Sequence, residues 1–184
     1  EIRLSLVGSE MCIRDSNRRS GGAAGLAVTI AQRASGHVSL LPSPAILERV
    51  ETKQAIEADR TVAAVLVEAA EAQAFLFTAG PCDASSAHVE NGYLSASDVE
   101  ELARRGAVGD VLGRYIDADG NIVDPQLDAR TVGVDLGRLR AAKRSIFVTA
   151  GDAKHDIART VVTSGLCSVL VTDETTARAL LEER

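Results

Sequence analysis

The chain has 184 residues, of which 20 are Lys or Arg and 26 are Asp or Glu, so its formal net charge is −6. This length suits one domain with a sizeable core, and contents of 46% hydrophobic and 25% charged residues are ordinary for a soluble globular protein. No apolar run approaches the roughly 20 residues of a membrane span, and the acidic balance and 3% aromatic content disfavour nucleic-acid binding by these residues themselves.

Residues 1–16 are predicted to be an adapter-derived leader rather than native protein. Residues 6–16 read LVGSEMCIRDS, which resembles the in-frame translation of a transposase-based sequencing-library adapter. The alternative is a genuine strand and loop, because Ile2, Leu4 and Leu6 alternate. Removing two basic and three acidic residues leaves 18 against 23, a net charge of −5. We therefore expect residues 17–184 to be a partial domain, the carboxy-terminal part of a longer protein.

The first half of this domain alternates helical and strand-like patterns. A short helical stripe occupies residues 26–31, and residues 37–41 predict a strand that ends at a Leu-Pro-Ser-Pro segment. Apolar residues recur at helical spacing over residues 62–69, which indicates an amphipathic helix. The apolar run at residues 74–78 ends at Ala-Gly-Pro and predicts a buried strand.

The middle of the chain predicts one helix and one hairpin. Ser97 and Glu100 have the spacing of a capping box, and we expect the helix that they begin to end at Gly106. Residues 111–116 and 121–123 flank an Asp-Ala-Asp-Gly turn, which is typical of a β-hairpin.

The last part of the chain repeats a strand–helix pattern. Residues 145–149 and 168–171 predict buried strands, and helices are expected across residues 157–162 and 173–183. Short apolar strands separated by helices predict an α/β fold with a largely parallel sheet and flanking helices.

Ligands of open parallel sheets bind beyond the carboxyl ends of the strands, which here lie at residues 78–80, 149–151 and 171–173. At the second of these ends, Gly151 allows close approach of a ligand, and the first N–H groups of the next helix can bind an anion. We expect this helix to begin near Asp152, which places Lys154 in its first turn, where the helix dipole disfavours a cation. Lys154 therefore either faces an anion such as a phosphate, or extends into solvent or pairs with Asp152.

A second candidate is Asp110, which lies between Gly109 and Gly113 and could accept hydrogen bonds from sugar hydroxyls. The alternative is a turn-forming Asp that bonds to its own backbone. The histidines lack metal-ligand spacing, and Asp117 and its neighbours lack the glycine and the Glu of an EF-hand. We predict no metal and no cofactor.

Taken together, these segments resemble the SorC/DeoR-type sugar-binding transcriptional regulators over about residues 25 to 182. The motifs that carry the resemblance are LLPSP at residues 40–44, AFLFTAG at 74–80, NGYLS at 91–95, GAVGDVLGRY at 106–115, DADG at 117–120, VGV at 132–134, AGDAK at 150–154 and VLVTDETTA at 169–177.

The resemblance implies a Rossmann-like effector-binding domain, similar to the fold of glucosamine-phosphate deaminases and ribose-phosphate isomerases. By position, Lys154 and Gly151 would hold an effector phosphate, and Asp110 with Gly109 would lie near the sugar hydroxyls. Gly80 would line the same pocket. Two weaker candidates, which a surface ion pair explains equally well, are Asp128 and Arg130.

The chain departs from the family pattern in two respects, because it has neither a helix-turn-helix nor the glycine-rich loop that usually opens the effector domain. The leading hypothesis is a ligand-sensing domain that binds a phosphorylated sugar without turning it over and controls DNA binding by a helix-turn-helix outside this chain. We expect it to be cytoplasmic and homo-oligomeric, with no membrane partner. The alternative is an active sugar-phosphate isomerase or deaminase on the same fold.

Overall fold

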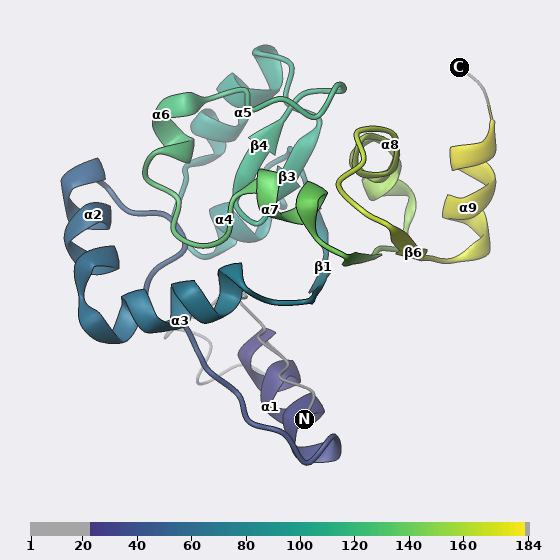
Figure 1. The fold of residues 1–184 in the computed structure, drawn as a ribbon. Helices are drawn as coiled ribbons and strands as arrows, with labels where there is room; N and C mark the ends of the chain where they lie inside the picture. Colours follow the sequence, from purple (N-terminus) through teal and green to yellow (C-terminus); the bar gives the residue numbers. More distant parts are fainter. Residues whose placement is uncertain (1–22, 183–184) are drawn as a thin grey trace.

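The computed structural model describes residues 23–182. Its elements in chain order (Figure 1) are α1 (Ala23–Arg33), α2 (Val50–Ala58), α3 (Arg60–Ala70), β1 (Ala74–Phe77), β2 (Ala79–Pro81), α4 (Ala87–Glu90), α5 (Ala96–Arg104), β3 (Gly109–Val111), β4 (Arg114–Ile116), α6 (Pro125–Asp128), α7 (Leu136–Ala141), β5 (Arg144–Val148), the 3-10 helix η2 (Asp152–Lys154), α8 (His155–Thr163), β6 (Val169–Val171) and α9 (Glu174–Leu181).

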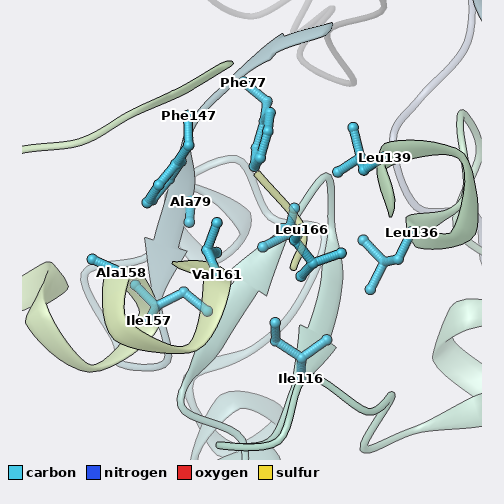
Figure 2. Close-up of a cluster of buried hydrophobic side chains, with 11 residues drawn as sticks. Phe77, Ala79, Ile116, Leu136, Leu139, Phe147, Ile157, Ala158, Val161 and Leu166 are labelled. Carbon is cyan, nitrogen blue, oxygen red and sulfur yellow. The ribbon is translucent and has the colours of Figure 1, made fainter. Parts of the chain in front are cut away.

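A parallel sheet carries the largest core cluster. Its strands lie in the order β1, β5, β6, and the register places Phe77 beside Phe147. The two rings stack with centroids 5.3 Å apart. Ile157, Ala158 and Val161 of α8 are buried in the same cluster (Figure 2), so the crossover helix between β5 and β6 covers this face of the sheet.

The opposite face of the parallel sheet remains partly open. Leu76, Val148, Val169 and Val171 alternate with the core-facing residues and are 37–50% exposed. The prediction that β1, β5 and β6 are fully buried strands is therefore wrong for one face, because only the side that packs against α8 is covered by the described elements. Successive side chains of a strand point to opposite faces, so only every second residue of these strands reaches the core.

A second, antiparallel sheet follows directly on β1. Its strands lie in the order β2, β3, β4. Leu112 and Gly113 form the two-residue loop between β3 and β4, with φ angles of 54° and 79°. Positive φ at both central residues is the geometry of a type I′ turn, whose twist matches that of the flanking strands. The single strand predicted over residues 111–116 is therefore two strands, and half of the strands in the described residues are antiparallel.

The predicted Asp-Ala-Asp-Gly turn is present, but the strand expected after it is reduced to one bridge between Ile116 and Ile122. The Asp117 carboxylate accepts hydrogen bonds from the backbone N–H groups of Asp119 and Asn121. These bonds, that from Asn121 above all, lower the pKa of Asp117.

The predicted helices are confirmed as α1, α3, α5, α8 and α9, with one correction to a cap. Ser95, not Ser97, begins α5. Its hydroxyl accepts from the N–H of Asp98, whose carboxylate accepts from the N–H of Ser95. No helix in residues 23–182 is both long enough and apolar enough to cross a membrane.

The strand predicted over residues 37–41 is absent. Leu41 is buried instead in a small cluster with Val62 of α3 and Val132. A strand needs a hydrogen-bonding neighbour, and no described segment pairs with residues 37–41. The α/β class, with a parallel sheet and flanking helices, is confirmed.

Candidate functional site

The carboxyl ends of the parallel strands meet as expected at one edge of the sheet. β1 continues into β2, β5 into η2 and α8, and β6 into α9. β2 and η2 are in contact. The structure thus brings the strand that carries Gly80 next to the turn that carries Gly151 and Lys154. Asp110 is the register partner of Gly80 and belongs to the same edge.

Gly151 adopts φ 94° and ψ 150°, a conformation that favours glycine. Its N–H donates to Asp173 Oδ2 at 2.9 Å. Asp173 also caps α9, accepting from the N–H of Thr176 at 2.7 Å. These backbone hydrogen bonds, that from Thr176 above all, lower the pKa of Asp173. The N–H of Gly151 is therefore already bonded to the Asp173 carboxylate.

The next two amides are open. Within residues 23–182, the N–H groups of Asp152 and Ala153 donate no hydrogen bond, and both residues are exposed. They begin the 3-10 turn η2, whose N–H groups point along the turn axis toward its start. This arrangement offers two donors to an anion at the sheet edge.

Lys154 lies beside these amides, at the N-cap of α8 rather than inside its first turn. It is half-buried, and its ammonium forms no ion pair with any described residue. The alternative pairing with Asp152 is not present, because the Asp152 carboxylate lies 3.6 Å from His155 Nε2 instead. A cation without a counter-charge at a helix N-terminus is unfavourable unless an anion joins it.

Asp110 is only 7% exposed. Its Oδ2 accepts from the N–H of Gly113 at 2.9 Å, and its Oδ1 lies 3.8 Å from His88 Nδ1. A Cβ added at Gly80 would lie 2.3 Å from Asp110 Oδ1. Glycine is therefore needed at this position, because the buried carboxylate lies directly against the backbone of β2.

Gly109 has a packing role in the structure. A Cβ added there would lie 2.5 Å from the carbonyl oxygen of Gly80 and 2.7 Å from Ile157 Cβ. Gly109 lets α8 pack closely on β2 and β3. Through this close packing, the part of the site next to α8 lies against the part that contains Asp110.

His88 belongs to the site but did not emerge from the sequence. It is buried, and its Nδ1 lies 3.2 Å from the Tyr115 hydroxyl. Burial, followed by the Asp110 charge, raises the pKa of Tyr115 above its usual range. The same two causes, with Asp83, raise the pKa of Cys82 to about 11. No sequence spacing connects His88 to Asp110, because α4 and β3 meet only through tertiary packing.

Asp128 and Arg130 lie away from this edge, since α6 and α8 flank the antiparallel sheet on different sides (Figure 1). Asp128 Oδ1 lies 3.0 Å from Nε of the buried Arg114. Arg130 donates to the carbonyl oxygen of Leu47 at 2.7 Å. Both contacts hold neighbouring segments together.

Arg130 also lines a pocket of about 330 Å³ next to α5, separate from the sheet edge. Four of its nine lining residues are acidic, and it contains none of the other predicted site residues. The full lining is Glu48, Tyr93, Leu94, Asp98, Glu101, Leu102, Asp124, Leu127 and Arg130.

Two threonines were also missed from the sequence. The Thr149 and Thr172 side-chain oxygens are buried and have no hydrogen-bond partner within the described residues. They follow the last residues of β5 and β6. A polar residue directly after a parallel strand is the signal that could have identified them.

Comparisons with known proteins agree with this architecture. A family model described as "Putative sugar-binding domain" matches residues 13–182. The chain is 33% identical over 143 residues to the deoxyribonucleoside regulator of Bacillus subtilis (strain 168). The aligned region covers 78% of this chain and 45% of that protein. The chain spans about half the length of the curated relatives it matches.

Two solved structures show the same fold. The DeoR family transcriptional regulator from Listeria monocytogenes aligns with a TM-score of 0.81 at 23% identity, over 88% of this chain and 66% of that chain. The full-length sorbitol operon regulator SorC from Klebsiella pneumoniae aligns with a TM-score of 0.79 at 21% identity, over 96% of this chain and 56% of that chain. These proteins are transcriptional regulators rather than enzymes, and the chain belongs to the family of sugar-binding domains found in SorC/DeoR-type transcriptional regulators.

Proposed function

We propose that this domain senses a phosphorylated sugar and, in the full-length protein, controls DNA binding by a helix-turn-helix outside this chain. The observation that carries the proposal is the unpaired Lys154 ammonium beside the open amides of Asp152 and Ala153. A phosphate group would receive hydrogen bonds from both amides and would neutralise the lysine charge. The edge beyond parallel strands is also where ligands of such sheets bind.

The sugar part of the effector would extend from this phosphate toward β2 and β3. Gly80 lines that direction, and the Asp110 carboxylate lies against it with oxygen lone pairs that can accept a sugar hydroxyl. The Gly113 N–H holds Asp110 in place before any ligand arrives, which lowers the entropic cost of binding. The names of the relatives refer to a deoxyribonucleoside and to sorbitol, both consistent with a polyhydroxyl ligand.

A ligand at the carboxyl edge of the parallel sheet is also consistent with a Rossmann-like fold related to that of the deaminases and isomerases. The sheet edge that an enzyme would use for turnover would here be used for binding alone. We infer a cytoplasmic regulator in which sugar-phosphate occupancy is the signal.

Isothermal titration calorimetry of the full-length protein tests the proposal. The probes are ribose phosphate, glucose phosphate and fructose phosphate, each compared with its unphosphorylated sugar and with inorganic phosphate. At least one sugar phosphate should bind more tightly than its parent sugar. Lys154→Ala should weaken that binding by roughly 10-fold or more, the usual effect of losing a charge-assisted contact.

Lys143→Ala is the matched control, because it removes the same charge immediately before β5, at the opposite end of that strand from Lys154. It should leave the affinity unchanged. Absence of binding to every sugar phosphate, or equal binding by the Lys154→Ala variant and the parent, would contradict the proposal.

A further inference from the structure

Three side chains at the sheet edge have buried polar atoms without a hydrogen-bond partner among the described residues: Thr149 Oγ1, Thr172 Oγ1 and His155 Nε2. Thr149 as a whole is only 5% exposed. The His155 Nε2 atom lies 3.6 Å from the Asp152 carboxylate, beyond hydrogen-bond distance. The great majority of buried polar groups in folded proteins are paired, so three exceptions in one place call for a physical explanation.

The register and the helix periodicity place these groups on the same side of the sheet. Thr149 follows Phe147 by two residues and so lies on the face that α8 covers. Val148 pairs with Val171, which makes Thr172 the neighbour of Thr149 on the next strand. The Thr149 N–H donates to the Val171 carbonyl oxygen at 3.0 Å, which extends the pairing to the strand end.

His155 approaches the same place from the helix. It is the first residue of the nine-residue helix α8 and precedes Ala158 by three residues. Residues three apart lie on one helix face, and Ala158 is fully buried in the cluster that contains Phe147 (Figure 2). The periodicity therefore predicts that His155 faces the sheet about one turn nearer the strand ends than Ala158 does.

We propose that Thr149, Thr172 and His155 form a second layer of donors in the phosphate site, which the phosphate of a sugar phosphate completes. This inference rests on the proposed function. Lys154 and the amides of Asp152 and Ala153 would form the outer layer of donors. The effector would reach the inner layer through a small displacement of η2 about Gly151, whose backbone adopts φ 94°.

In the protein without ligand, the Thr149 hydroxyl is buried without a hydrogen-bond partner among the described residues. A buried hydroxyl without a partner destabilises the fold, and its replacement by an apolar group of the same shape relieves that cost. The same hydroxyl would strengthen binding of the anion. Removal of the Thr149 hydroxyl should therefore change stability and affinity in opposite directions, whereas a hydroxyl with a purely structural role would lower both.

The test compares Thr149→Val with Thr149→Ser in the full-length protein, using the tightest sugar phosphate of the panel and inorganic phosphate as probes. Thr149→Val keeps the shape and deletes the hydroxyl, whereas Thr149→Ser keeps the hydroxyl. We expect Thr149→Val to weaken sugar-phosphate binding by roughly 10-fold, as for a hydrogen bond to a charged group. Its thermal midpoint without ligand should be equal to or higher than that of the parent, and Thr149→Ser should retain the parent affinity.

Thr172→Val provides a second, independent variant with the same expectation. Unchanged affinity in both valine variants, with binding still sensitive to Lys154→Ala, would overturn this inference and leave the proposed function intact. A fall of both affinity and thermal midpoint would show that the hydroxyls have structural partners in the free protein, such as a buried water, and would also overturn it. Absence of sugar-phosphate binding by the parent would overturn both proposals.

Discussion

Asp110 shows how a single buried carboxylate depends on small neighbours. Gly113 N–H bonds one of its oxygens, and the other lies against the backbone of Gly80 and 3.8 Å from His88 Nδ1. A carboxylate held in this way cannot rotate freely to follow a ligand, so its direction is set before binding. The residues that fix this direction are therefore as important for the site as Asp110 itself.

Gly80→Ala tests this dependence. The new Cβ would lie 2.3 Å from Asp110 Oδ1, so the carboxylate must move and lose its bond to Gly113. We expect a loss of about 1–3 kcal/mol in the free energy of unfolding, as for other cases of overpacking, together with weaker sugar-phosphate binding. Urea denaturation and calorimetry measure the two effects.

Gly25→Ala is the matched control, because a Cβ at this position of α1 meets no atom within 4 Å. Since alanine is the better helix former, this variant should be neutral or more stable by up to about 1 kcal/mol. If Gly80→Ala were as stable as the parent, Asp110 would not be held against β2 as described.

Short polar residues begin several helices of the domain. Asp59, Asp124, Asp135 and Asp173 accept backbone N–H bonds at the N-termini of α3, α6, α7 and α9. Each bond satisfies a donor that the helix itself cannot pair. α8 differs from these helices, because its N-cap is Lys154 and no side chain caps it. α2 and α4 also lack a side-chain cap, and α8 is the helix at which we place the anion because it begins at the sheet edge.

Helix α5 allows a direct comparison of the capping residue expected from the sequence with the one in the structure. Ser95→Ala removes the acceptor of the Asp98 N–H and should lower the free energy of unfolding by about 1 kcal/mol. Ser97→Ala removes a hydroxyl that contacts only the Ser95 hydroxyl, at 2.8 Å, and should change it by less than about 0.5 kcal/mol. Urea unfolding of both variants measures the difference, and the reverse order would contradict the assignment of Ser95.

At the scale of the whole molecule, residues 23–182 cover one face of the parallel sheet and leave the other open. Parallel sheets in α/β proteins normally have both faces covered. The open face of this sheet presents Val148 and Val171 at 40% and 50% exposure. An apolar surface of this kind favours association between molecules.

The double substitution Val148→Thr and Val171→Thr tests the consequence for the 184-residue chain. Threonine keeps the branched shape and adds a hydroxyl that water can bind at these exposed positions. We expect less aggregation by light scattering and a thermal midpoint within a few degrees of that of the parent. Val111→Thr is the control at a fully buried position, where the same change should lower stability by about 1–3 kcal/mol. Unchanged aggregation would show that the open face is not the associating surface.

Local signals in the sequence were sufficient for most elements. Helices α3, α5, α8 and α9 followed from their apolar spacing, and strands β1, β5 and β6 from short apolar runs bounded by turn residues. The errors arose where a neighbour decides the outcome. Residues 37–41 have a strand-like pattern but no strand partner among the described residues, and residues 111–116 fold back at Leu112 and Gly113.

The sequence by itself determined the α/β class, the family resemblance and the strand ends at which Gly151 and Lys154 lie, because these follow from periodicity and from short motifs. Only the tertiary structure decided which polar groups at those ends have partners. It pairs Gly151 with Asp173 and buries His88 beside Asp110. Among residues 23–182, it leaves the Lys154 ammonium and the Thr149 hydroxyl without a partner. Hydrogen bonding and burial join residues that are distant in sequence, and no local pattern encodes those distances.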